Sequence, residues 1–313
     1  MFLVDDMGWQ DTSVPFWTKK TPFNERYHTP AMERLAREGM MFTQAYASCV
    51  CSPTRVSLMS GMNAARHRVT NWTLERDKPV DGKSDILSYP DWNVNGVQPV
   101  DTIPHSAYAT MLPRLLKDNG YFTIHCGKAH YGAIGTPSAD PLNCGFEVNI
   151  AGHAAGGPGS YLGTENFGNN EKGGYTPPWG VPGLEKYHGD SIFLTEALTR
   201  EALSTLDKVK PSGKPFYLYM SHYAVHIPLY ADQRYYEKYL DMGLNEAEAR
   251  YSSMIEGMDK SLGDIMDWLD RNGLAENTVI LFMSDNGGFS LRPRAGELHT
   301  HNKPLKSGKG SAY

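Results

Sequence analysis

Short apolar runs alternate along the chain with longer segments in which apolar residues recur every three or four positions. The first pattern is typical of buried strands, and the second is typical of helices that cover a sheet. Their alternation predicts an α/β fold with a mostly parallel central sheet flanked by helices. The predicted strands are residues 1–4 (MFLV), 40–46 (MMFTQAY), 121–127 (YFTIHCG), 215–221 (PFYLYMS) and 278–284 (TVILFMS).

The helix signals lie between these runs. Thr29-Pro30 offers an N-cap followed by proline at the first helical position, and Gly39 is suited to end that helix. A long helix is predicted between Asn245 and Asn272, because apolar residues there fall on one face. Shorter helices are predicted at 53–60, 112–119 and 194–206.

Residues 136–190 show neither the strand-like nor the helix-like pattern of apolar residues, and they are rich in Gly, Pro and Asn. A segment of this length without regular structure is uncommon in a compact domain, and it usually has a function or is disordered. We interpret 136–190 as a substrate-shaping insertion. The alternative is a surface excursion without such a role.

Composition narrows the class of protein. The chain has 313 residues, of which 40% are hydrophobic, and this is enough for a large core in one domain or two. Its formal net charge of -5 argues against general nucleic-acid binding. No apolar run reaches membrane-spanning length, and no export signal is visible. Four cysteines without a CxxC spacing argue against a disulfide scaffold, a zinc cage and a redox pair.

Oxygen-bearing side chains follow two of the predicted strands. Asp5-Asp6 comes directly after residues 1–4, and Asp285-Asn286 comes directly after 278–284. In open α/β sheets the functional crevice lies beyond the carboxyl ends of the strands, so both pairs would lie there. Such oxygen ligands suit a hard cation, Ca²⁺ or Mg²⁺, rather than Zn²⁺. Taken singly, either pair is also typical of a turn or a helix cap.

Basic residues follow two further strands. Lys128 and His130 come after residues 121–127, and His226 comes after 215–221. Imidazoles act as general acids and bases near neutral pH, and a lysine holds an anion. The stretch 291–310 is rich in Arg, His and Lys and includes Lys309 between two glycines. It is either a solvated basic loop or a wall for an anionic substrate.

The segment Cys51-Ser52-Pro53-Thr54-Arg55 has the pattern C-x-P-x-R. By itself, Cys51 could be a structural thiol, a metal ligand or a nucleophile. The pattern matches the signature of the type I sulfatases, and the other motifs stand in the order found in that family, so the whole chain resembles a type I sulfatase of the alkaline phosphatase superfamily. These motifs are Asp5-Asp6, VSLMSG at 56–61, GKAHYG at 127–132, AVHIP at 224–228, SDNGG at 284–288 and PLKSGKG at 304–310.

The resemblance implies that residues 1–313 form a catalytic domain with the alkaline phosphatase-like sulfatase fold, which hydrolyses sulfate esters of carbohydrates or of other alcohols. Cys51 would be oxidised to formylglycine (3-oxoalanine) by a maturation enzyme. The hydrated aldehyde would attack sulfur and then expel sulfate by elimination, which a serine could not do. The metal ion would be Ca²⁺, with Mg²⁺ as the second choice, and its ligands would be Asp5, Asp6, residue 51, Asp285 and Asn286.

The resemblance also implies roles for the basic residues. Arg55 would stabilise the hydrated aldehyde, with His130 as its partner or base. Lys128 and Lys309 would hold the sulfate group. His226 would bind sulfate and help to protonate the leaving oxygen.

The chain departs from the family pattern at its two ends. Four residues precede Asp5, and the chain stops at Tyr313 without the smaller C-terminal subdomain that the family has, which predicts truncation at both ends. The resemblance implies a periplasmic or secreted location and no nucleic-acid or membrane partner. Two alternatives stay open. One is a phosphatase or phosphodiesterase of the same superfamily, with a Ser or Thr nucleophile and two zinc ions, and the other is an inactive fragment that binds sulfated glycans.

Overall fold

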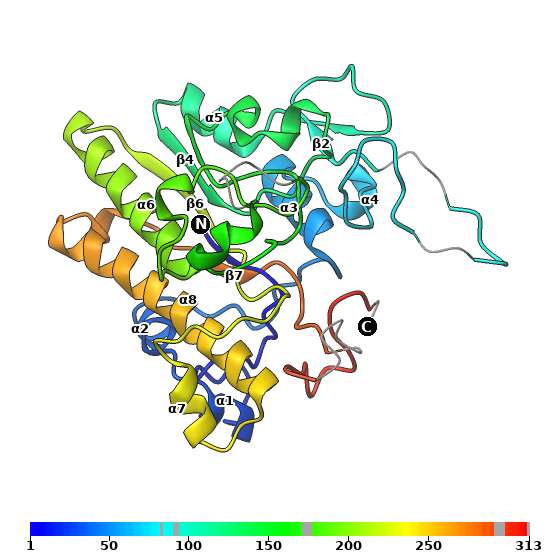
Figure 1. The fold of residues 1–313 in the computed structure, drawn as a ribbon. Coiled ribbons are helices and arrows are strands. Elements are labelled where there is room, and N and C mark those ends of the chain that lie inside the picture. The colour runs from blue at the N-terminus through cyan, green and yellow to red at the C-terminus, as the bar shows by residue number, and fades with distance from the viewer. Residues whose placement is uncertain (82–83, 90–93, 171–176, 291–297, 312–313) are drawn as a thin grey trace.

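The computed structural model describes residues 1–81, 84–89, 94–170, 177–290 and 298–311. Its centre is a five-stranded sheet in the order β5-β4-β6-β1-β7, and every neighbouring pair is parallel (Figure 1). The predicted α/β class with a parallel sheet is thereby confirmed. The strands are β1 (Phe2–Val4), β4 (Phe122–Gly127), β5 (Val148–Ile150), β6 (Phe216–Ser221) and β7 (Phe282–Ser284), and a separate parallel pair consists of β2 (Val97–Gln98) and β3 (Ala107–Tyr108).

Helices cover both faces of the central sheet. Successive strand residues point to opposite faces. Phe2 and Val4 of β1 therefore belong to the core that packs on α2 (Pro30–Glu38), α6 (Leu194–Val209) and α8 (Glu246–Arg271). Leu3, between them, belongs to a second core with α3 (Cys51–Ser60) and with the start of α5 (Leu112–Asp118). Such two-sided cover is expected for a parallel sheet.

Shorter elements complete the fold. The remaining α-helices in the described residues are α1 (Pro22–Arg26), α4 (Ala64–His67) and α7 (Tyr236–Asp241). Short 3₁₀ segments occur at Pro137–Ala139, Pro141–Cys144, Glu185–Tyr187, Lys210–Ser212 and Ala275–Asn277, and a kinked one occurs at Gly163–Gly168. In the part of the chain that the structure describes, no helix combines the length and apolarity needed to cross a bilayer.

The helix predictions are confirmed with small shifts. In α8, the Asn245 side chain caps the helix by accepting a hydrogen bond from the backbone N–H of Glu248. The helix predicted from Pro53 begins earlier, at Cys51. Proline is tolerated there because the first turn has no use for its missing N–H. Gly61 ends α3 with φ at 69°, a conformation that glycine adopts without strain.

Two strand predictions are wrong in whole or in part. Residues 40–46 form no strand, because no neighbouring strand pairs with them, and their apolar side chains Met40, Phe42 and Tyr46 are exposed. The strand predicted at 278–284 is reduced to Phe282–Ser284. Its one partner is β1, whose pairing with β7 begins at Phe2 opposite Phe282, so the residues before Phe282 have no strand beside them.

Residues 136–190 are more regular than their composition indicates. They contain β5, which pairs with β4 at the edge of the central sheet through Ile124 opposite Val148. Many of their side chains are buried, among them Phe146, Tyr161 and Phe167. Residues 171–176 lie outside the described residues. The interpretation of 136–190 as an insertion without regular structure is therefore wrong in this respect, and its role in shaping a substrate site stays a prediction.

Candidate active site

The two oxygen-bearing pairs meet at the carboxyl end of the sheet. Asp5 and Asp6 follow β1, and Asp285 and Asn286 follow the adjacent parallel strand β7, so the strand pairing itself brings them together. The backbone N–H of Asp6 donates to Oδ1 of Asp285 at 3.3 Å. The Asn286 amide donates to Oδ1 of Asp6 at 2.8 Å. The expectation that the two pairs lie together beyond the carboxyl ends of the strands is confirmed.

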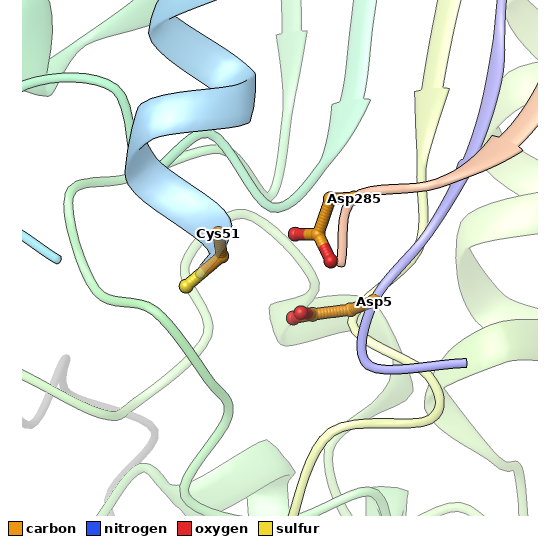
Figure 2. A group of neighbouring side chains, drawn as sticks. All are labelled: Asp5, Cys51 and Asp285. Atoms are coloured by element: carbon orange, nitrogen blue, oxygen red, sulfur yellow. The ribbon is translucent and has the colours of Figure 1, made fainter. Parts of the chain in front are cut away.

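Cys51 is the first residue of α3 and lies near Asp5 and Asp285, and Figure 2 shows these three side chains. Its Sγ atom and one carboxylate oxygen each of Asp5 and Asp285 all lie within 4.8 Å of one another. Burial raises the pKa of the Cys51 thiol, although the charges of Lys128 and Lys309 oppose the shift. An unmodified Cys51 is therefore a protonated thiol at neutral pH and a poor nucleophile.

Arg55 lies one helical turn after Cys51 and is fully buried. Its Nε donates to Oδ2 of Asp285 at 2.9 Å, and its Nη2 lies 2.8 Å from the same oxygen. Its Nη1 donates to the Lys128 carbonyl at 3.0 Å and to Ser221 Oγ at 2.6 Å. The guanidinium thus joins α3 to the ends of three strands, β4, β6 and β7.

Lys128 leaves β4 through a turn that requires glycine. Gly127 has φ at 97°, and a Cβ atom there would lie 1.9 Å from the Ser221 carbonyl oxygen. The Lys128 N–H donates to that same carbonyl at 2.7 Å. The Lys128 side chain, fully buried, then forms an ion pair with the Asp5 carboxylate.

The imidazoles of His130, which is buried, and His226, which is partly buried, are both held by backbone carbonyls. Nε2 of His130 donates to the Thr73 carbonyl at 2.8 Å, which leaves Nδ1 without a hydrogen-bond partner. Nδ1 of His226 donates to the Ile227 carbonyl at 2.6 Å, and its Nε2 lies 3.7 Å from Oδ2 of Asp6. Burial and then the charge of Lys309 lower the pKa of His226 to about 3, so the ring is neutral at pH 7.

Lys309 reaches Asp6 from the far end of the chain. Its Nζ lies 2.7 Å from both carboxylate oxygens of Asp6. Burial would raise the pKa of Asp6, but the charge of Lys309 holds it below its ordinary value. Within the basic stretch 291–310, residues 291–297 lie outside the described residues.

Asn302 holds the segment that carries Lys309, and sequence reasoning missed it. Its carboxamide oxygen accepts a hydrogen bond from the Gly288 N–H, and its amide donates to the Gly288 carbonyl, both at 2.9 Å. The Lys309 N–H bonds the same carbonyl at 3.1 Å. We call this arrangement the Asn302–Gly288 clasp. A lone asparagine in a polar stretch carries no sequence signal for such a role.

The cluster fits a hard cation. Oδ1 of Asp5 and Oδ1 of Asn286 are buried and have no hydrogen-bond partner. Burial and then the adjacent carboxylate of Asp285 raise the pKa of Asp5 well above its usual range, because crowded buried carboxylates disfavour the charged form. A divalent cation held by these oxygens would relieve both features.

The cluster does not resemble a two-zinc cage. Among the described residues, the group of acidic, cysteine or histidine side chains with metal-ligand spacing is Asp5, Cys51 and Asp285, and it contains no histidine. His130 and His226, each bonded to a carbonyl through one ring nitrogen, do not belong to this group. The ligand set of a two-zinc phosphatase is therefore absent from the described residues.

Comparison with known proteins gives the family. The family model described as Sulfatase matches residues 2–312, and the chain belongs to the sulfatase family. A "Sulfatase" of Formosa agariphila is 28% identical over all of this chain and 60% of its own length. The N-acetylgalactosamine-6-sulfatase of Mus musculus is 29% identical over all of this chain and 54% of its own length. The chain thus spans about half to three fifths of these curated relatives.

Solved structures agree with this assignment. The crystal structure of Ps i-CgsB in complex with k-i-k-neocarrahexaose superposes with a TM-score of 0.72 and is 27% identical. The match covers 99% of this chain and 62% of that one. The predicted sulfatase resemblance is confirmed at the level of family and fold.

Proposed function

We propose that this protein hydrolyses sulfate esters to an alcohol and inorganic sulfate, with formylglycine made from Cys51 as the nucleophile. The observation that carries the proposal is the position of Cys51, at the first turn of α3 and within 4.8 Å of the oxygens of Asp5 and Asp285. The raised pKa of the thiol disfavours direct attack by an unmodified cysteine. A formylglycine-generating enzyme is the partner that this proposal requires, and a secreted or periplasmic location goes with it.

The proposed metal is one Ca²⁺, with Mg²⁺ second, held by Asp5, Asp6, Asp285 and Asn286 with residue 51. The unpartnered oxygens of Asp5 and Asn286 support this choice. When bound, the ion supplies positive charge that neutralises the sulfate group and lowers the basicity of an oxygen at position 51. Carboxylate and amide oxygens without sulfur or imidazole ligands favour calcium over zinc.

The proposed sulfate site consists of Lys128, Lys309 and His226. Both ammonium groups bond to carboxylates of the proposed metal site, Lys128 to Asp5 and Lys309 to Asp6. With these carboxylates engaged by a cation, the two ammonium groups become donors for the sulfate oxygens. Nδ1 of His226 carries the proton donated to the Ile227 carbonyl, so Nε2 of the neutral ring is an acceptor. His226 is proposed to protonate the leaving alcohol oxygen only after the negative charge of a bound sulfate ester has favoured protonation of Nε2.

Arg55 and His130 are proposed to control the nucleophile. Arg55 is fixed by Asp285, Ser221 and the Lys128 carbonyl, so its charge is pre-positioned beside residue 51. Nδ1 of His130 is buried and without a hydrogen-bond partner, and it is an acceptor because Nε2 carries the proton. This is the state required of a base that removes a proton from a hydroxyl group at position 51.

We propose a sulfated carbohydrate as the substrate. Support comes from the relatives, since one is an N-acetylgalactosamine-6-sulfatase and a solved neighbour holds a neocarrahexaose. These names also supply probes. The probes are sulfated oligosaccharides from carrageenan and from polymers that contain N-acetylgalactosamine 6-sulfate. Each oligosaccharide is compared with its sulfated monosaccharide.

The proposed function is tested by comparing the rates at which the protein hydrolyses a small sulfate ester and a small phosphate ester. Protein made together with the maturation enzyme is expected to hydrolyse 4-nitrophenyl sulfate in preference to 4-nitrophenyl phosphate, and elemental analysis is expected to find one calcium per chain. Two zinc ions per chain together with phosphate-ester turnover would instead support the phosphatase alternative. Absence of turnover with any sulfate ester, despite an aldehyde at position 51, would support the glycan-binding alternative.

Lys309 gives a separate test of sulfate handling. Lys309→Met keeps the length of the side chain but removes its charge, so kcat is expected to fall by about 10²–10⁴-fold. Inhibition by inorganic sulfate is expected to weaken in parallel, because the same ammonium group would hold the product. Lys303→Met is the matched control, since Lys303 lies on the same segment and is exposed. Equal activity and equal sulfate inhibition in the two variants would remove Lys309 from the site.

A further inference from the structure

A cavity of about 800 Å³ adjoins the candidate active site. His226 belongs to both, because it lines the cavity while its Nε2 lies 3.7 Å from the Asp6 carboxylate. Gly157, also in the cavity wall, packs against the same ring, where a Cβ atom would lie 2.8 Å from Nδ1. The volume is large within the range of roughly 300–1,000 Å³ typical of ligand sites. A substrate that reacts beside His226 therefore has room to extend into this cavity.

Trp179 forms an apolar wall of the cavity. Its side chain is 41% exposed, although an indole is among the costliest groups to leave in water. Its carbonyl accepts a hydrogen bond from the Gly159 N–H at 2.7 Å. The carbonyl of the preceding Pro178 is bonded by Nε2 of His153 at 3.1 Å. The exposed ring is thus carried by an anchored segment of residues 136–190.

The first turn of α8 forms a polar wall of the same cavity. Glu246 and Arg250 line it and form an ion pair, with 2.6 Å between Oε2 and Nη2. Their side chains are 68% and 40% exposed, so each keeps unused donors or acceptors. Asn245 lies beside them, and its carboxamide oxygen caps α8.

The combination of these walls selects a class of ligand. A pyranose ring has an apolar face of C–H groups and a rim of hydroxyl groups, so it fits an indole on one side and paired donors and acceptors on the other. A purely apolar aryl group would make no hydrogen bonds to the remaining donors and acceptors of the Glu246–Arg250 pair. A second sulfate group would require an uncompensated cation, but Arg250 in the described lining is already neutralised by Glu246.

We infer that this cavity binds an uncharged sugar residue joined to the residue that carries the scissile sulfate. The inference rests on the proposed function, and it narrows the substrate from any sulfate ester to an oligosaccharide or polysaccharide. The sugar ring packs on Trp179, and its hydroxyl groups bond to Glu246 and Arg250. Binding energy from this residue favours the longer substrate over the monosaccharide.

The test compares substrate lengths in matched variants. The measured quantity is the ratio of kcat/KM for a sulfated oligosaccharide to kcat/KM for 4-nitrophenyl sulfate, with the oligosaccharides named above. Trp179→Ala is expected to lower this ratio about tenfold through KM, and Arg250→Ala about threefold to tenfold. Trp179→Phe is expected to restore most of the loss. An unchanged ratio in both alanine variants, or monosaccharides hydrolysed as efficiently as oligosaccharides by the parent protein, would overturn the inference.

Two surface variants serve as controls. Trp17→Ala removes a tryptophan of similar exposure, 43%, that does not line the cavity. Arg200→Ala removes an arginine paired with the glutamate four residues earlier, as Arg250 is. Both are expected to leave the ratio unchanged.

Calorimetric titration of Cys51→Ala protein with the desulfated oligosaccharides separates the two proposals. Oligosaccharide binding that is lost in Trp179→Ala would support the sugar subsite even if the protein showed no turnover. Turnover of the aryl sulfate without any oligosaccharide binding would overturn the subsite and leave the proposed function intact.

Discussion

Protein made together with the maturation enzyme is expected to carry an aldehyde at residue 51, and Cys51→Ser is expected to lower steady-state turnover by about three orders of magnitude or more. A serine offers one hydroxyl group, whereas the hydrated aldehyde offers two. Sulfated serine therefore cannot release sulfate by elimination and should accumulate after one turnover. Mass spectrometry of the tryptic peptide that contains residue 51 measures both the aldehyde and the sulfated serine.

Two controls are the stage at which the maturation enzyme is added, before or after folding, and the second cysteine, Cys49. Residues 51–56, which include the proline and arginine of the signature, are buried in the folded protein. The maturation enzyme must therefore act before α3 packs, and addition of the enzyme to folded protein is expected to leave the thiol unchanged. Cys49 is exposed and should stay a thiol in every preparation. An unmodified Cys51 in an active protein, combined with full activity of Cys51→Ser, would refute the proposal.

Asp285→Ala is expected to abolish metal binding and turnover together and to destabilise the fold. Asp285 is fully buried and accepts hydrogen bonds from Arg55 and from the Asp6 N–H. Its removal leaves the Arg55 charge buried, with Asp5 4.0 Å away as its remaining carboxylate partner. Loss of one partner of a buried ion pair typically costs about 3–5 kcal/mol. Calcium content, turnover and the midpoint of urea unfolding are the measurements.

Two variants separate metal loss from destabilisation. Asp285→Asn keeps the shape and one acceptor oxygen, so it is expected to unfold less easily than Asp285→Ala while still losing calcium affinity. Asp259→Ala removes a buried carboxylate that accepts hydrogen bonds from the Ala31 and Met32 N–H groups at the start of α2. It should lose stability but keep calcium and activity. Stoichiometric calcium in Asp285→Ala would show that this carboxylate is not a ligand.

The sequence was most informative where strand ends carry chemistry. Asp5-Asp6, Lys128, His226 and Asp285-Asn286 follow β1, β4, β6 and β7, and parallel strands bring their carboxyl ends to one edge. The position of Cys51 could be inferred from its motif, because the proline and Gly61 delimit a short helix. The meeting of these strand-end side chains is therefore a consequence of sheet topology that the predicted strands anticipate, whereas Arg55 and Lys309 were identified only through the family resemblance.

Periodicity was misleading where pairing partners decide the structure. The run at 40–46 is as apolar as a true strand, but it has no strand beside it. The edge strand β5 escaped prediction because three residues between glycine-rich stretches give too short a pattern. Asn302 was missed for another reason, because its role depends on its hydrogen bonds with Gly288, which no sequence pattern marks. The inferred role of Trp179 likewise depends on a cavity that it shares with His226, from another part of the chain.

The Asn302–Gly288 clasp fixes the position of Lys309 in the candidate active site independently of the intervening chain. Lys309 is located by its bond to the Gly288 carbonyl, which the Asn302 carboxamide also holds, so its position does not depend on the length of chain between residues 288 and 302. The entropic cost of closing a loop grows only slowly with its length. A change in the length of chain between the two clasped residues is therefore expected to leave the ammonium group in its place.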